Sequence, residues 1–280
     1  MSESSNPLKQ FFRQPAVYVK LPSRGEHWPD GSLQRTETGE HPVYPMTAID
    51  EITYRTPDAL FNGTAVVNVI QSCIPSIKNA WEMPMIDLTA LLIAIRIASF
   101  GHDLELMTTC PKCENVDEFS LDLRQALDQL GLPDYSKTIK KGDVEIIFKP
   151  INYRQINAGN MEQYENQRTV AAIPVSDLPE EEKVQRMAEV MKKITELTIS
   201  FLRDSIAAVR TPTALVTESQ YIEEYLHQCD RHIFGQIRDT VVEFREASEM
   251  RPIKWTCTAC SHDYTQPIGL DQSNFFDSAS

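Results

Sequence analysis

Two short segments of the sequence, "TCPKCE" at residues 109–114 and "TCTACS" at residues 256–261, have the same form. Each segment contains two cysteines separated by two residues. A C-x-x-C turn can present two thiolates to one tetrahedral ion, and a structural zinc site is complete with four such ligands. The two pairs therefore predict one structural zinc ion that joins distant parts of the chain. Its expected ligands are Cys110, Cys113, Cys257 and Cys260.

Three interpretations of the two pairs differ in what they require of the flanking sequence. A thioredoxin-like redox pair should sit at the start of a helix, which lowers the thiol pKa. The other two interpretations are a shared metal site and two unrelated surface pairs. Both pairs here are followed by strand-like or polar residues, which favours the metal site over the redox pair. Because loop-closure entropy grows only logarithmically with length, the long segment between the pairs does not prevent them from meeting. Four thiolates leave no open coordination position, so the expected role is structural.

Composition and charge restrict the partners of the chain. At 280 residues, of which 41% are hydrophobic, the chain is long enough to form a sizeable core. It carries 27 basic and 40 acidic residues, a formal net charge of −13, which disfavours binding to nucleic-acid phosphates. The first cysteine pair itself lies in an acidic stretch, residues 105–124. A nucleic-acid-binding zinc module would have the wrong charge there.

Two features bear on membranes and secretion. The longest apolar stretch, residues 88–100, is too short to span a bilayer and contains Arg96, so a buried core helix is expected. The first ten residues lack the basic start and apolar run of a signal peptide. We therefore expect a cytosolic protein without a membrane anchor. In a reducing compartment, the paired cysteines are expected to bind metal rather than to form disulfides.

The predicted fold class is α+β and predominantly helical, with a small β module that resembles a zinc ribbon. This module is expected to be assembled from residues 100–150 and the C-terminal segment, where apolar residues alternate as in strands. Four parts are expected along the chain. They are an extended N-terminal arm (1–50), a helical core segment (51–100), a split zinc module (101–150 plus 251–280) and a long helical hairpin insert (151–250).

Several helices are predicted from capping residues and apolar spacing. Asp87 is expected to cap a central helix over residues 87–100. Residues 176–209 are predicted to form one long helix, about 50 Å in length if unbroken. A further helix is expected to begin at the capping-box sequence "TESQ" (217–220) and to continue to Ile237. The remaining cysteines are interpreted as small apolar core residues: Cys73 and Cys229.

No motif of a common enzyme class is present in the sequence. It contains no P-loop, G-x-S-x-G, H-E-x-x-H or G-x-G-x-x-G pattern. Its six histidines are scattered, and His262, close to the second cysteine pair, is expected at the surface. The chain is therefore predicted not to be an enzyme and to have no catalytic residues. Two alternatives stay open: a zinc-containing nucleic-acid-binding protein, and a zinc or thiol enzyme.

Several segments together resemble the members of one protein family. They are "YVKLPSRGEHW" (18–28), "YPMTAIDEI" (44–52), "RTPDALFNGTAVVNVIQSCIPSI" (55–77), "LLIAIRIASFGHDLEL" (91–106), "CPKC" (110–113) and "CTACSHDYTQPIGLDQSNFF" (257–276). The chain is similar to the baseplate hub and hub-assembly proteins of T4-like contractile-tailed bacteriophages. The most specific part of this resemblance lies between residues 46 and 63.

This resemblance implies a protein without catalysis that takes part in building the baseplate hub at the tip of the tail. Family members are hub subunits or chaperone-like assembly factors, and both roles stay open. The implied partners are other phage tail or baseplate proteins, with neither nucleic acid nor membrane. The implied location is the host cytoplasm during assembly and, for a subunit, the virion. "KLPSRG" (20–25) and "YRTPDALFNG" (54–63) are the expected contacts, although both are also ordinary turn and helix-cap sequences.

Overall fold

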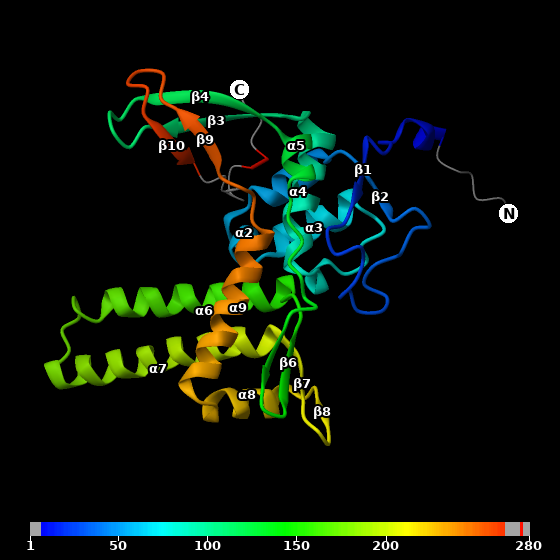
Figure 1. Cartoon of the computed structure of the whole chain (residues 1–280). Helices are drawn as coiled ribbons and strands as arrows, with labels where there is room; N and C mark the ends of the chain where they lie inside the picture. The colour runs from blue at the N-terminus through cyan, green and yellow to red at the C-terminus, as the bar shows by residue number, and fades with distance from the viewer. Residues whose placement is uncertain (1–6, 267–274, 277–280) are drawn as a thin grey trace. The chain divides into compact units, whose positions relative to one another are not determined.

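The computed structural model of the chain describes residues 7–266 and 275–276 (Figure 1). Two compact units emerge, one comprising Met1–Ala80, Asp87–Leu130 and Met250–Ser280, the other Trp81–Ile86 and Gly131–Glu249. The structure is mixed, with more helix than strand and a cluster of four cysteines, so the predicted fold class is confirmed. The division into four parts stays a prediction.

The first unit is built around two buried helices, α3 and α4. The helix α3 buries Val66, Val69 and Ile70, and α4 is apolar on nearly all sides, as expected for a central helix. A shorter helix, α5, follows the strands that carry the first cysteine pair. The helices that lie wholly or mostly in this unit are η1 Pro7–Phe11, α1 Ala48–Tyr54, α2 Pro57–Phe61, α3 Thr64–Cys73, α4 Met85–Phe100 and α5 Leu123–Asp128. The short helix η2 Ala80–Glu82 belongs mostly to the second unit.

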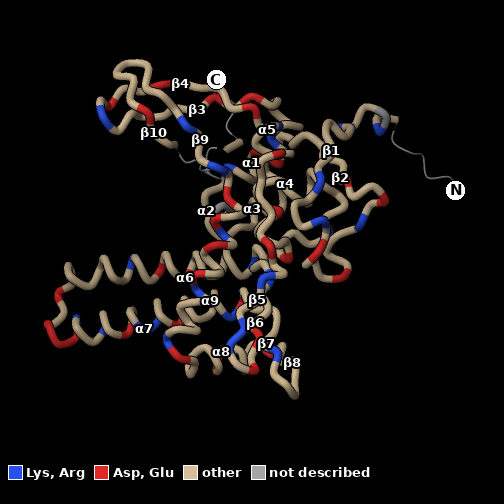
Figure 2. The backbone as a smooth tube through the Cα atoms, viewed as in Figure 1, with Lys and Arg blue, Asp and Glu red and all other residues tan. Residues whose placement is uncertain are grey.

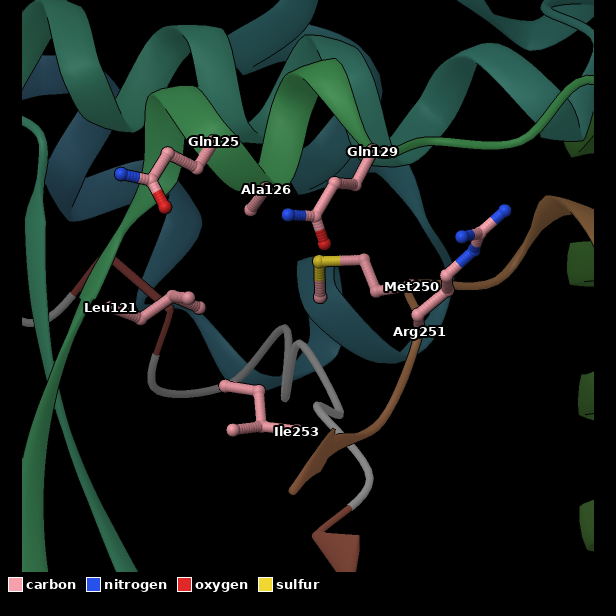
Figure 3. Close-up of a pocket in the computed structure, with 7 residues that line it drawn as sticks. All are labelled: Leu121, Gln125, Ala126, Gln129, Met250, Arg251 and Ile253. Atoms are coloured by element: carbon pink, nitrogen blue, oxygen red, sulfur yellow. The ribbon is translucent and has the colours of Figure 1, made fainter. Parts of the chain in front are cut away.

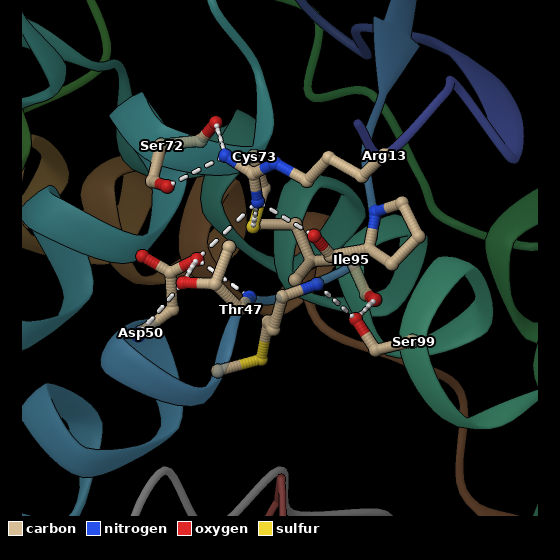
Figure 4. A network of polar contacts seen from close by, with 9 residues as sticks. Arg13, Thr47, Asp50, Ser72, Cys73, Ile95 and Ser99 are labelled. Atoms are coloured by element: carbon tan, nitrogen blue, oxygen red, sulfur yellow. Dashed lines mark hydrogen bonds and ion pairs between the residues drawn. The ribbon is translucent and has the colours of Figure 1, made fainter. Parts of the chain in front are cut away.

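Residues near the N-terminus are fastened to this helical core. The strands β1 (Val17–Lys20) and β2 (Glu40–Val43) pair antiparallel. The Arg13 guanidinium donates to the carbonyl oxygens of Pro45 (2.6 Å) and Ser72 (2.8 Å), and it also contacts Asp50 (Figure 4). These bonds connect the start of the chain to α1 and α3.

The helix α1 was not expected from the sequence. Its first turn is closed by a capping box, in which the Asp50 N–H donates to Thr47 Oγ1 and the Thr47 N–H donates to the Asp50 carboxylate (Figure 4). Such a reciprocal pair satisfies two backbone donors at the helix start. A signal was therefore present in "TAID", but the helix is only seven residues long.

Asp87 does not cap α4, which begins two residues earlier at Met85. Its side chain is fully buried and accepts three hydrogen bonds from the N-terminal segment. The donors are the Ser23 N–H (2.8 Å), the Ser23 hydroxyl (2.5 Å) and the Trp28 indole N–H (2.8 Å). The expectation of a cap was wrong, because these tertiary donors satisfy the carboxylate.

Two β ribbons carry the cysteine pairs. The strands β3 (Asp103–Thr109) and β4 (Val116–Asp122) pair antiparallel, as do β9 (Ile253–Thr256) and β10 (Asp263–Gln266). Each ribbon is a separate two-stranded sheet, and strand character in these segments agrees with the alternation in the sequence. The expected β residues after Gln266, at 267–270, lie outside the described residues.

The second unit packs helices on a four-stranded antiparallel sheet with the strand order β5-β6-β7-β8. Ile146, Phe148 and Ile206 from the sheet meet Leu202, Ile237 and Phe244 from the helices in its core. The helices α6 and α7 form a hairpin of neighbouring antiparallel helices (Figure 1). The bounds are β5 Thr138–Lys141, β6 Val144–Phe148, α6 Tyr153–Ala172, α7 Glu180–Asp204, β7 Ile206–Arg210, β8 Leu215–Val216, α8 Ser219–Gln228 and α9 Arg231–Ser248.

Two predicted helices of this unit are shorter than expected. The helix predicted over 176–209 ends at Asp204, because Ile206–Arg210 pairs with β6 as an inner strand. The helix predicted to run to Ile237 is broken after Gln228, where the Asp230 carboxylate caps α9 by accepting from two backbone N–H groups. The expected capping box at 217–220 is not formed. Glu218 occupies the N-cap position, and its side chain accepts no hydrogen bond from the first turn of α8.

Candidate metal centre

The two cysteine pairs come together in the first unit. The sulfurs of Cys110, Cys113, Cys257 and Cys260 all lie within 4.8 Å of one another. The distance from Cys110 Sγ to Cys260 Sγ is 3.7 Å, and the distance from Cys113 Sγ to Cys257 Sγ is 3.6 Å. A group of four thiols this close can hold a metal ion.

The sulfur spacing agrees with tetrahedral coordination. With metal–sulfur bonds of about 2.3 Å, the edge of a tetrahedron of four sulfurs is about 3.8 Å long. The sulfur–sulfur distances of 3.6 and 3.7 Å are close to that edge. They are far longer than the S–S bond of a disulfide, about 2.05 Å. The arrangement therefore fits a metal centre better than a pair of disulfides.

The first cysteine turn has a compact backbone geometry. The Cys110 N–H donates to the carbonyl oxygen of Asn115 (2.9 Å), and the Glu114 N–H donates to the carbonyl oxygen of Cys110 (2.9 Å). Glu114 closes the turn with a positive φ of 59°. The turn thereby directs the thiols of Cys110 and Cys113 to the same side.

The second cysteine turn repeats this geometry. The Cys257 N–H donates to the carbonyl oxygen of His262 (2.9 Å), and the Ser261 N–H donates to the carbonyl oxygen of Cys257 (3.0 Å). Ser261 has a φ of 54°, in the position that Glu114 occupies in the first turn. Two equivalent turns, each at the tip of a ribbon, therefore supply two thiols apiece.

The pKa values of the thiols differ within the cluster, because backbone N–H groups, burial and neighbouring thiols shift them in opposite directions. Burial raises the pKa of Cys110, but the N–H groups of Lys112 and Cys113, together with the thiols of Cys113 and Cys257, lower it to about 7. The N–H of Asn115 lowers the pKa of Cys113, whereas the neighbouring thiols and burial raise it to about 12. The four thiols therefore do not ionise independently, and a cation held among them would favour the thiolate forms.

A buried carboxylate fastens the two ribbons beside the cysteine turns. Asp117 on β4 accepts from the Trp255 indole N–H (3.1 Å) and from the Thr258 N–H (3.2 Å). The Thr258 hydroxyl and the Asn115 amide donate to its other oxygen. The bond from the Thr258 hydroxyl is the main cause that lowers the pKa of Asp117. Asp117 therefore holds the turn that contains Cys257 and Cys260 against the opposite ribbon.

Further from the thiols, aromatic and polar side chains also connect the β3–β4 ribbon to the β9–β10 ribbon. The rings of Phe119 and Trp255 have centroids 5.1 Å apart. The Thr108 hydroxyl lies 3.1 Å from the Tyr264 hydroxyl and 3.0 Å from the Gln266 side-chain oxygen. The ribbons are thus held together by side chains as well as by the cysteine cluster.

The other residues singled out in the sequence lie outside the cluster. Cys73 is fully buried, and burial raises the pKa of its thiol to about 12, as suits an inert core cysteine. Cys229 is half-buried, with its sulfur 3.5 Å from the carbonyl oxygen of Leu226. The His262 ring stacks on Tyr264.

A small pocket lies where β4 ends and β9 begins, at the ends of these strands opposite the cysteine turns (Figure 3). The Met250 thioether points toward Ala126 and Gln129, whereas the Arg251 guanidinium points outward (Figure 3). No carboxylate, imidazole or thiol is among the described residues that line it, so these residues supply no general base of those types. The lining residues are Leu121, Gln125, Ala126, Gln129, Met250, Arg251 and Ile253.

Sequence reasoning missed Asp117, the residue that links the ribbons. A usable signal was present, since Asp117 shares its strand parity with the expected inward residues Phe119 and Leu121. A carboxylate on the apolar face of a strand needs buried donors. The position of those donors, 138 and 141 residues further along the chain, could not be read from the pattern.

Comparisons with known proteins give one match. A family model described as "T4 bacteriophage base plate protein" matches residues 37–277, which is most of the chain. No curated protein and no solved structure matches the chain significantly. Over residues 7–266 and 275–276, none of the helices combines the length and apolar character that crossing a bilayer requires.

Proposed function

Because the chain belongs to the T4 bacteriophage base plate protein family, we propose that it acts in the baseplate hub without catalysis, by binding other tail proteins. It serves either as a hub subunit or as a hub-assembly factor. The family match over residues 37–277 is the observation that carries this proposal. The corresponding locations are the host cytoplasm during assembly and, for a subunit, the tail of the virion.

Exposed apolar side chains on α1 and α2 support a role in protein binding. Ile49 and Ile52 on α1 are 74% and 69% exposed, and Phe61 on α2 is 48% exposed. Apolar residues grouped on a surface mark interaction sites more often than scattered ones do. These residues lie in or beside the expected contact segment 54–63. In the other segment, 20–25, the buried side chains of Leu21 and Ser23 are not available to a partner.

The test of this function is to follow the protein through tail assembly. A hub subunit is expected in purified mature particles at a fixed ratio to other baseplate proteins. An assembly factor is expected on baseplate intermediates in infected cells and to be lost from mature particles. Quantitative mass spectrometry of both fractions distinguishes these roles, and absence from both would overturn the proposal. Ile49→Asp with Ile52→Asp should reduce the yield of complete baseplates, whereas Leu215→Asp, an exposed apolar position on β8, should not.

We further propose that Cys110, Cys113, Cys257 and Cys260 hold one structural zinc ion. The spacing of the sulfurs, the two equivalent turns and the all-sulfur donor set support zinc over ions that prefer oxygen ligands. When bound, the ion would supply charge neutralisation and a cross-link between the ribbons. The four thiolates leave no place for a reactant on the ion, which agrees with a protein that acts by binding.

The Asp117→Asn variant is expected to bind zinc about 10 to 100-fold more weakly than the native chain. The amide keeps the shape of the side chain but loses one acceptor oxygen, so the hold on Thr258 and on the second cysteine turn loosens. Competition with a chromogenic chelator measures this affinity. Asp122→Asn is the matched control, since Asp122 lies on the same strand and pairs with Arg124 away from the cysteines. An unchanged affinity in Asp117→Asn would show that the carboxylate does not support the metal site.

A further inference from the structure

The helix α7 uses one side to pack on α6. Val190 and Leu197 are buried on this side. Phe201 packs against α6 at Gly159, where an added Cβ atom would lie 2.3 Å from the Phe201 ring. This close approach fixes the rotation of α7 about its own axis. The side of α7 that faces α6 is therefore defined.

A second apolar stripe runs along a different side of α7. Val184 is 67% exposed and Met191 is 46% exposed, although both are large apolar residues. At about 100° per residue, they lie only about 20° apart around the axis. Ala188, which is also exposed, lies between them in sequence and about 40–60° to one side. The same count places them about 80–140° away from the residues on the side that packs on α6. The hairpin partner therefore does not cover this stripe.

Charges along α7 favour a second copy of the same helix as the occupant. The acidic start, Glu180–Glu182, is followed by Lys183 and Arg186, and the middle carries both acidic and basic residues (Figure 2). At about 100° per residue, Glu181 and Lys192 lie on the same flank of the stripe, whereas Lys193 lies on the opposite side of the helix. A parallel copy would place the acidic starts side by side. An antiparallel copy can place Glu181 of each chain beside Lys192 of its partner, which is favourable.

The residue spacing gives this antiparallel pairing a specific register. When Val184 of one copy lies opposite Met191 of the other, the two-fold axis passes between residues 187 and 188. Glu181 then lies about 3 Å along the axis from Lys192 of the other copy, at 1.5 Å per residue. Two-fold symmetry makes both the apolar and the charged contact twice. Among the residues that the structure describes, Lys192 pairs with Glu196 at 3.7 Å, and this exposed pair is weak enough to exchange.

We propose that the α6–α7 hairpin is a self-association element. Two copies of the chain pair through the outer side of α7, antiparallel, so that the two hairpins form a four-helix bundle. The apolar stripe of each α7 is then covered by that of the other. This surface belongs to the second unit and does not depend on the metal centre. The pairing is expected to be reversible and in the micromolar range, since each copy offers a narrow apolar stripe.

Sedimentation velocity of the full chain over a range of concentrations tests this proposal. The native chain should pass from monomer to dimer. The Val184→Glu and Met191→Glu double variant should stay monomeric with unchanged far-ultraviolet circular dichroism, since both positions are exposed. Lys193→Glu, an exposed change on the opposite side of α7, should dimerise like the native chain.

A charge exchange tests the register separately. Glu181→Lys and Lys192→Glu should each weaken the dimer, because each places like charges together twice. The variant with both changes should recover dimerisation, since the pair is restored with reversed signs. A native chain that stays monomeric at the highest concentrations, or a dimer insensitive to Val184→Glu with Met191→Glu, would overturn the proposal. Failure of the charge exchange alone would overturn the register and with it the antiparallel pairing described here.

Discussion

Replacing Cys257 and Cys260 together by serine is expected to lower the zinc content of the purified chain from one equivalent to near zero. The two remaining thiols, Cys110 and Cys113, sit on a single turn and cannot complete a tetrahedral set. Structural zinc contributes about 10–16 kcal/mol of apparent binding free energy in small zinc domains at pH 7. The loss should therefore release the β9–β10 ribbon from the β3–β4 ribbon. Elemental analysis measures the zinc, and amide exchange in β9 measures the release.

The matched control for this variant is Cys229→Ser. Cys229 lies in the other unit, and its thiol is close to the carbonyl oxygen of Leu226, to which a serine hydroxyl can donate. This variant should keep one equivalent of zinc. A double variant of Cys257 and Cys260 that retained nearly full zinc content would contradict a shared site.

The cysteine turns could be predicted from sequence because their geometry is local. Two cysteines at a spacing of three residues, each pair preceded by strand-like residues, specify a turn at the tip of a ribbon. The pairing between the turns was also accessible, since four thiolates complete one tetrahedral site. The structure brings Cys110 and Cys257 into one cluster, as that reasoning required.

The parts that could not be predicted depend on distant residues. The segment Ile206–Arg210 has the composition of a helix end, yet it becomes a strand because β6 supplies its backbone partners. The break before α9 arises from Asp230, whose side chain caps the new helix although the apolar spacing continues across it. Propensity and periodicity describe one segment at a time. They do not report which segment elsewhere competes for its hydrogen bonds.

Among the residues whose role was not predicted, Asp87 has the largest expected effect on stability, and burial is the main influence on its pKa. Burial raises the pKa of Asp87, against the opposing effect of the bonds from Ser23 and Trp28. For a carboxyl whose pKa is higher in the folded state, the stabilising contribution is full below the unfolded value of about 3.9. This stabilising contribution is lost as the pH rises through the pKa of Asp87 in the folded state. Relative to Asp87→Asn, which does not titrate, the native chain should therefore lose stability as the pH rises through that range.

The Asp87→Ala variant is expected to lower the free energy of unfolding by about 2–4 kcal/mol at neutral pH. It leaves the Ser23 N–H and the Trp28 indole N–H buried without their acceptor, and each such donor costs about 1–3 kcal/mol. Relief from burying a charge offsets part of this cost. Denaturant unfolding measures the change, and faster amide exchange at Ser23 locates it in the N-terminal segment.

Two further variants separate the carboxylate from its surroundings. Ser23→Ala removes only the hydroxyl bond and should cost about 0.5–1.5 kcal/mol. Asp87→Asn keeps one acceptor oxygen but turns an N–H group toward one of the donors, so its cost should fall between the other two. If Asp87→Ala were as stable as the native chain, the buried carboxylate would not be what holds residues 23–28 to α4. The burial of Leu21 and Trp28 would then contribute more to holding the segment than the carboxylate does, and Trp28→Ala would cost more stability than Asp87→Ala.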